Sequence, residues 1–156
     1  MRHIFVDTSA WYALINDADA NHRRAKSYYL SLIKRRTALV TSSDVLTESY
    51  TRLRYSVGHR FAVRFHGMME MAQRQGILRV VWVDEDIASE AWDIFERYED
   101  QFFSFQDCTS FVIARRLDIR DVFAFDEDFG VMGFRVWPGH SNQRASAAVV
   151  ETSKEM

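Results

Sequence analysis

Several features that define other classes of protein are missing from this chain of 156 residues. It has one cysteine, Cys108, so an internal disulfide is impossible and we expect a reducing compartment. The best apolar stretch, residues 77–83, contains Arg79 and is too short to cross a membrane. The first residues lack the apolar segment of a signal peptide. These absences predict a soluble, cytoplasmic protein without a membrane partner.

Two kinds of catalytic pattern are also missing. The five histidines form no pair at i,i+2 or i,i+4, so a zinc site is not expected; they are His3, His22, His59, His66 and His140. No histidine is close in sequence to Cys108, which favours a small buried side chain over a nucleophile.

The net charge is small, but the charged residues are unevenly distributed along the chain. The net charge is −2, yet residues 21–79 carry twelve Lys or Arg against three acids, and residues 84–107 carry nine acids against Arg97. A protein that cleaves a polyanion can use a basic half to hold phosphates beside an acidic site. Each run is equally compatible with a solvated helix face.

Strand and helix patterns alternate along the chain. Apolar runs predict strands over residues 4–6, 39–41, 80–83, 122–125 and 134–137. Apolar stripes and capping residues predict helices from residue 8 or 9 to 15, over about 21–35, from 42 or 43 onward, and over 59–75, 85–98 and 104–117. This alternation predicts an α/β/α sandwich around a mainly parallel sheet of about five strands. We expect one domain over residues 1–139 and a flexible tail over 140–156.

Four acidic residues lie where this pattern would bring them together. Asp7 and Asp126 follow apolar runs, while Glu48 and Asp107 lie about one turn inside predicted helices. The carboxyl ends of parallel strands face one crevice, which is where ligands bind. Two carboxylates ~4 Å apart repel by about 4 kcal/mol at an effective dielectric near 20. A hard divalent cation relieves this repulsion best, so the sequence predicts a Mg²⁺ or Mn²⁺ site for phosphate chemistry.

Asp7 and Glu48 each have a structural alternative. Asp7 can cap the following helix, although Thr8 and Ser9 are available for capping, and we therefore favour a metal ligand. Glu48 can form an i,i+4 ion pair with Arg52 at the helix surface.

The other two acids also allow a second interpretation. Ser104 and Asp107 form a capping-box pattern, which is compatible with a metal site because the first turn of a helix favours an acid. Asp126 and Asp128 compete for the last ligand position, with Asp126 the stronger choice and Asp128 acting through water.

Four motifs in this order resemble those of PIN-domain nucleases and, among them, the VapC toxins. They are Phe5-Val6-Asp7-Thr8-Ser9, the helix start at residues 42–48 that contains Glu48, Ser104-Phe105-Gln106-Asp107-Cys108, and Phe125-Asp126-Glu127-Asp128-Phe129 followed by Gly133-Phe134. The resemblance covers about residues 3–138. Ala124 departs from it, because a threonine is common two residues before the last acid; this puts the fine metal affinity in doubt.

The resemblance implies a Mg²⁺- or Mn²⁺-dependent endoribonuclease that is inhibited by a cognate antitoxin and forms a homodimer. It makes Asp7, Glu48, Asp107 and Asp126 catalytic and metal-binding, adds Asp128 to the metal ligands, and gives Thr8 and Ser104 supporting roles.

Other functions fit less well. A PIN nuclease of RNA processing and a non-catalytic PIN-like binding module remain alternatives. A haloacid-dehalogenase-like phosphatase needs an acid where Ser9 stands, and a receiver domain needs a late lysine that residues 123–129 lack.

Overall fold

The computed structural model describes residues 2–139, and the flexible tail expected over 140–156 lies outside them. Five strands form one sheet; they are β1 (His3–Val6), β2 (Ala38–Ser42), β3 (Leu78–Val81), β4 (Asp121–Phe123) and β5 (Arg135–Trp137). The strand order is β3-β2-β1-β4-β5, and all four pairs are parallel. The α/β/α sandwich expected from the sequence is confirmed.

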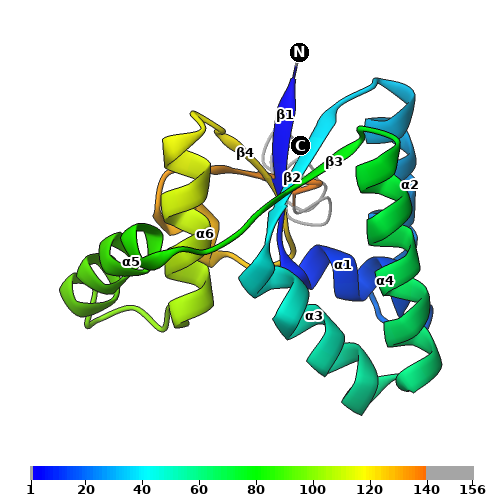
Figure 1. Cartoon of the computed structure of the whole chain (residues 1–156), viewed down its shortest axis with the longest axis horizontal. Coiled ribbons are helices and arrows are strands. Elements are labelled where there is room, and N and C mark those ends of the chain that lie inside the picture. Colours follow the sequence, from blue (N-terminus) through cyan, green and yellow to red (C-terminus); the bar gives the residue numbers. More distant parts are fainter. Residues whose placement is uncertain (1, 140–156) are drawn as a thin grey trace, which may run out of the picture.

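The helices cover both faces of this sheet. They are α1 (Thr8–Ile15), α2 (His22–Lys34), α3 (Ser43–Ser56), α4 (His59–Arg74), α5 (Glu85–Arg97), α6 (Phe105–Arg116) and the short α7 (Asp128–Val131). Crossovers between parallel strands are right-handed, so α1–α4 lie on one face, and α5 and α6, which lead back across the sheet, lie on the other. Figure 1 shows these two groups on opposite sides of the strands. No helix within residues 2–139 has the length and hydropathy to span a bilayer.

Two strands end earlier than the sequence predicted. The third strand covers residues 78–81 rather than 80–83, because Val83 leaves the sheet and its N–H donates to Ser43 Oγ at 2.9 Å. The fourth covers 121–123 rather than 122–125, because the N–H of Phe125 donates to Ser9 Oγ at 2.9 Å. The early end of β4 leaves residues 124–127 as a loop that leads into α7, a helix the sequence did not predict.

The core lies on both faces of the sheet and is rich in aromatic side chains. Phe111 packs edge-on against Phe129 on the α6 side, and Trp11 packs against Phe65 on the α4 side. All four are fully buried. Their burial fixes α1 and α6 against the sheet, and these two helices carry Asp7 and Asp107 at their starts.

Candidate metal centre

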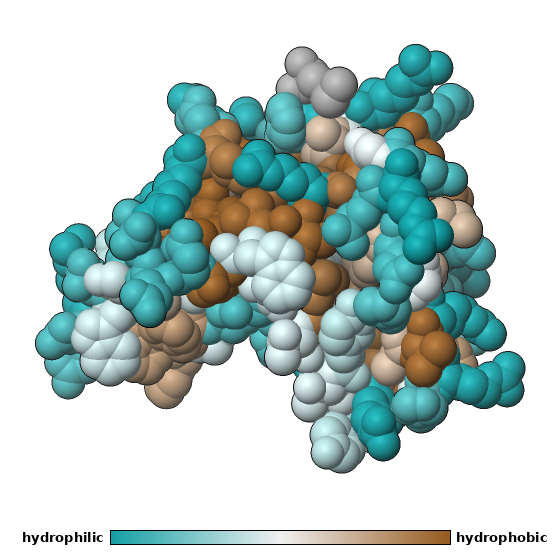
Figure 2. All heavy atoms as spheres, viewed as in Figure 1, coloured by the Kyte–Doolittle hydropathy of each residue, from teal (hydrophilic) through white to brown (hydrophobic). Residues whose placement is uncertain are grey.

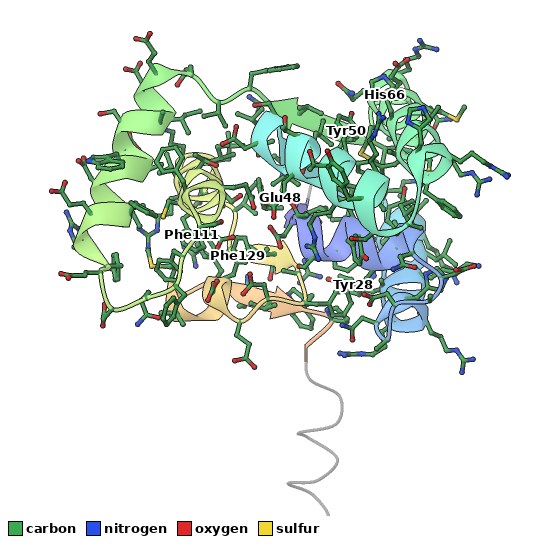
Figure 3. All side chains as sticks on the ribbon, turned by 90° about the horizontal axis from the view of Figure 1, so that it is seen from below. Tyr28, Glu48, Tyr50, His66, Phe111 and Phe129 are labelled. Atoms are coloured by element: carbon green, nitrogen blue, oxygen red, sulfur yellow. The ribbon has the colours of Figure 1, made fainter. Side chains whose placement is uncertain are left out.

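The predicted acids gather at the carboxyl end of the sheet. β1 and β4 are neighbours, and the chain leaves them toward opposite faces, so a crevice opens between them. Asp7 follows β1 directly, and Asp126 lies three residues beyond β4. In the space-filling view of Figure 2, the molecule is hollowed between its two halves at this edge. Viewed from that side in Figure 3, Glu48 points into the space between the halves.

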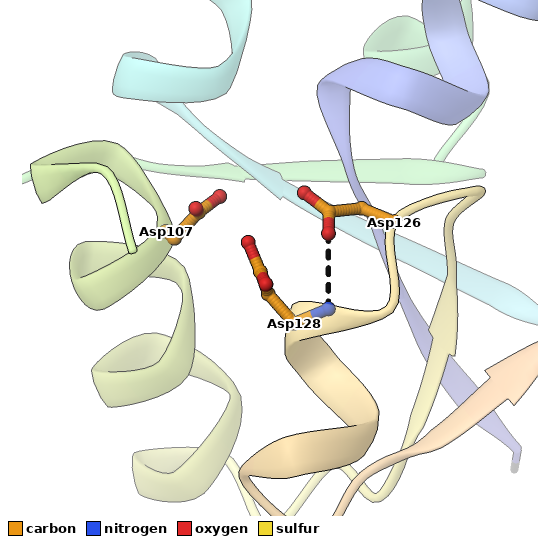
Figure 4. A group of neighbouring side chains, drawn as sticks. All are labelled: Asp107, Asp126 and Asp128. Atoms are coloured by element: carbon orange, nitrogen blue, oxygen red, sulfur yellow. Dashed lines mark hydrogen bonds between the residues drawn. The ribbon is translucent and has the colours of Figure 1, made fainter. Parts of the chain in front are cut away.

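Three carboxylates converge closely in this crevice. Asp107, Asp126 and Asp128 each offer one oxygen, and these three atoms lie within 4.8 Å of one another. Figure 4 shows that the side chains come from the start of α6 (Asp107), the loop before α7 (Asp126) and the first residue of α7 (Asp128). The N–H of Asp128 donates to Asp126 Oδ1 at 2.9 Å, which turns the chain so that both acids face the same point. The structure thus groups both residues that competed for the last ligand position.

Asp107 is held by the capping box that the sequence predicted. Its N–H donates to Ser104 Oγ, and its own Oδ2 accepts from the N–H of Ser104, both at 3.0 Å. Burial raises the pKa of Asp107 to about 7, with further contributions from the charges of Asp7 and Asp126, while the hydrogen bonds from Ser104 oppose the rise. This carboxyl therefore keeps its proton to a higher pH than an ordinary aspartate.

Asp7 caps α1, and the expectation that Thr8 or Ser9 does so is wrong. The helix begins at Thr8, so the preceding residue is the cap, and Asp7 Oδ2 accepts from the N–H and the hydroxyl of Ser9 at 3.1 and 2.7 Å. Thr8 instead donates its hydroxyl to the carbonyl of Val45 at 3.4 Å, which ties α1 to α3. The other oxygen of Asp7, Oδ1, is buried and has no hydrogen-bond partner within residues 2–139. Burial is the main cause of the raised pKa of Asp7.

Glu48 lies at the edge of this cluster rather than within the close group. Burial raises its pKa, as do the charges of Asp7 and Asp126, while Arg52 lowers it. The i,i+4 ion pair considered from the sequence does not form, because the guanidinium of Arg52 lies over the ring of Tyr12, 4.4 Å from its centroid.

Ser9 is a site residue whose role the sequence did not reveal. Its hydroxyl donates to Asp7 Oδ2 and accepts from the N–H of Phe125, so it joins the start of α1 to the loop that carries Asp126. A serine two residues after an acid is a local signal for capping. Its second partner, 116 positions away, leaves no mark in the sequence.

The donor set fits a hard divalent cation. All candidate ligand atoms are carboxylate oxygens, which suit Mg²⁺ and Mn²⁺ better than zinc. Leaving a buried acceptor such as Asp7 Oδ1 without a partner costs about 1–3 kcal/mol, and a cation in the crevice would relieve that cost.

Comparison with known proteins identifies the class. The family model of the PIN domain matches residues 4–135, so the chain belongs to the PIN-domain family. Among curated relatives, the 23S rRNA-specific endonuclease VapC20 from two strains of Mycobacterium tuberculosis is 38% identical over 131 residues, which are 84% of this chain and 95% of the relative. The resemblance to PIN-domain endonucleases of the VapC kind is thereby confirmed.

Solved structures agree with this placement. The crystal structure of M. tuberculosis VapC20, described as a toxin that cleaves the sarcin-ricin loop, superposes with a TM-score of 0.74 at 39% identity and covers 84% of this chain and 95% of its own. FitAcB from Neisseria gonorrhoeae (17% identity, 85% of this chain and 95% of its own) and VapBC2 from Rickettsia felis (12% identity, 86% and 96%) each give a TM-score of 0.61, and at this identity they support the fold alone.

Proposed function

We propose that this protein hydrolyses RNA phosphodiester bonds with a Mg²⁺ or Mn²⁺ ion held by Asp7, Glu48, Asp107, Asp126 and Asp128. The proposal is carried by the convergence of three carboxylate oxygens within 4.8 Å, beside the unpartnered Oδ1 of Asp7. Such a buried cluster is unfavourable by itself: burial first, and then the charges of neighbouring acids, raise the pKa values of Asp7 and Asp107.

The protein's own residues supply a rigid set of ligands. When bound, the cation would activate water for attack and neutralise charge on the scissile phosphate. Ser104 holds one oxygen of Asp107, and Ser9 holds one oxygen of Asp7, which leaves the second oxygen of each free to face the ion. Hydrogen bonds of this kind orient ligands and strengthen metal binding, and mutating such partners costs about 10–100-fold in metal affinity or activity.

A ribosomal RNA substrate and an antitoxin partner extend this proposal. The relatives at 38% identity are named for cleavage of 23S rRNA, which makes a structured ribosomal RNA the first substrate to test. The similar structures include toxin–antitoxin pairs, such as VapBC2 of Rickettsia felis. We propose a toxin whose antitoxin lays a segment along the acidic crevice and places an Arg or Lys against the carboxylates. A homodimer and a cytoplasmic location remain predictions.

The decisive experiment is RNA cleavage by the purified protein with Mg²⁺, Mn²⁺ or EDTA. We expect site-specific cuts in ribosomal RNA with either cation, none with EDTA, and a loss of about a hundredfold (~2.7 kcal/mol) or more in Asp107→Asn. Asparagine keeps an oxygen for the N–H of Ser104, so the capping box survives and only the charge is lost. Undiminished cleavage in EDTA would refute metal dependence, and an inert wild-type protein would favour the binding module.

The toxin assignment needs its own test. Expression of the chain should arrest growth, and co-expression of a small partner that co-purifies with it should restore growth. A protein that cleaves RNA but is harmless and binds no such partner would instead be a nuclease of RNA processing.

A further inference from the structure

Arg52 on α3 is an exposed arginine with unused hydrogen-bond donors. Its guanidinium lies over Tyr12, 4.4 Å from the ring centroid, and makes no hydrogen bond or ion pair with any residue of 2–139. It lies one helical turn beyond Glu48 and acts on that carboxyl through its charge. The aromatic contact therefore holds the cation beside the acidic crevice without occupying its N–H groups.

Several other arginines use their donors in ion pairs within the protein. Arg116 pairs with Glu90, and Arg135 pairs with Asp121. Arg52 does not, although a positive charge at this place weakens the attraction of the crevice for a metal ion. The presence of the Arg52 guanidinium beside the crevice, despite the weaker attraction for a metal ion, is explained if it binds an anionic group of the substrate. The planar guanidinium matches a phosphate group well.

Tyr55 continues the same face of α3. It follows Glu48 by seven residues and Arg52 by three, so the three side chains form one stripe about 10 Å long that leads away from the crevice. Its side chain is 83% exposed, which is unusual for a large aromatic residue, and it lines an open pocket of about 590 Å³ between α3 and α4. The pocket wall also includes Tyr50 and His66, whose side chains are hydrogen-bonded at 2.9 Å and are labelled in Figure 3.

We infer that Arg52 and Tyr55 bind the RNA strand where it leaves the metal centre. Arg52 contacts a backbone phosphate next to the scissile one, and Tyr55 stacks on a base at the mouth of the α3–α4 pocket. A basic side chain followed by an exposed aromatic one is the combination that binds single-stranded nucleic acid without reading its sequence. The inference rests on the proposed ribonuclease function and assigns the path of the substrate.

The test measures RNA binding separately from cleavage. In the Asp107→Asn background, binding of a labelled single-stranded RNA is followed by fluorescence anisotropy at several salt concentrations. We expect Arg52→Ala to weaken binding about tenfold and to reduce the slope of log affinity against log salt by about 0.7. Arg52→Lys keeps the charge but lacks the planar guanidinium, and we expect its affinity for RNA to lie between those of the wild type and Arg52→Ala.

Arg64 offers a matched control for Arg52. It is also exposed and lies over an aromatic ring, that of Phe61 at 5.6 Å, but it belongs to α4 and not to the stripe of Glu48, Arg52 and Tyr55 on α3. Arg64→Ala removes the same charge, and we expect wild-type affinity and an unchanged salt slope. Equal effects of Arg52→Ala and Arg64→Ala would overturn the inference, because net charge alone would then account for both.

Tyr55 is tested by a second pair of variants. Tyr55→Ala should weaken binding about fivefold or more, whereas Tyr55→Phe keeps the ring and should bind like the wild type. Light scattering on both variants checks the rival explanation: an altered oligomeric state in Tyr55→Ala would show a protein contact and overturn the stacking role. Cleavage by the wild type with Mg²⁺ is measured first. Its absence would contradict the proposed ribonuclease function, whereas the binding measurements test the roles of Arg52 and Tyr55.

Discussion

At the scale of single residues, Asp7 divides two tasks between its two oxygens. Oδ2 caps α1 through Ser9, whereas Oδ1 is buried without a partner within residues 2–139. Capping and metal binding are usually weighed as rival explanations of an acid at a helix start. Here one carboxylate can serve both, because the cap needs a single acceptor oxygen.

This division predicts different effects for two substitutions of Asp7. Asp7→Asn keeps an acceptor for the cap but removes the charge, so the free energy of unfolding in EDTA should not fall below that of the wild type, while Mg²⁺-dependent RNA cleavage falls about a hundredfold or more. Asp7→Ala should lose the same activity and, in addition, about 1 kcal/mol of stability. Urea unfolding and cleavage rates measure the two effects. Full activity of Asp7→Asn would leave Asp7 a purely structural residue.

At the scale of secondary-structure elements, the centre is built where helices begin. Asp7 caps the start of α1, and Ser104 caps the start of α6, which has Asp107 in its first turn. The start of a helix carries partial positive charge, which favours ionised carboxylates nearby. Ser9 adds the connection between α1 and the loop before α7, so two elements that are distant in the sequence hold their acids in one position.

The connection through Ser9 predicts a selective effect on metal affinity. Ser9→Ala removes the hydroxyl donor to Asp7 and the acceptor for the N–H of Phe125. Because the hydrogen bond from the Ser9 hydroxyl lowers the pKa of Asp7, its loss raises that pKa further. The Mg²⁺ concentration for half-maximal cleavage should rise about tenfold. Ser9→Thr keeps the hydroxyl, and an increase of the same size in that variant would contradict this explanation.

At the scale of the whole molecule, the buried acids make the metal-free protein sensitive to pH. The pKa values of Asp7, Glu48, Asp107 and Asp128 are all raised, in each case mainly by burial. An acid with a raised pKa binds its proton more tightly in the folded than in the unfolded state. Its stabilising contribution is therefore complete below the unfolded value near 3.9 and is lost as the pH rises through the folded value, about 7 for Asp107.

The melting temperature in EDTA should consequently be lower at pH 8 than at pH 5. Mg²⁺ binds the ionised carboxylates, so its stabilising effect should be larger at pH 8 and should reverse much of the loss. Thermal unfolding at both pH values, with EDTA and with Mg²⁺, measures this. Asp107→Asn removes the carboxyl whose pKa is raised to about 7 and should flatten the pH dependence. A variant as sensitive as the wild type would show that other groups cause it.

Local patterns were enough to predict much of this molecule. The alternation of apolar runs and stripes indicated five strands and the long helices, because side-chain periodicity reflects which face of an element is buried. The capping box of Ser104 and Asp107 was also readable, since its partners lie three residues apart. The short α7 and the early ends of two strands were not, because hydrogen bonds that Ser9 and Ser43 accept from distant backbone N–H groups end those strands.

By itself, the sequence determined the order of the elements, the PIN-like class and the set of acids that meet at the sheet edge. Only the tertiary structure decided that Asp128 joins Asp107 and Asp126, that Asp7 keeps one oxygen free, and that Arg52 lies on Tyr12 instead of pairing with Glu48. The physical reason is the separation along the sequence of the residues that interact. Neighbours within one or two turns interact in any helix of that sequence, whereas contacts between separate elements depend on how the sheet and its helices pack.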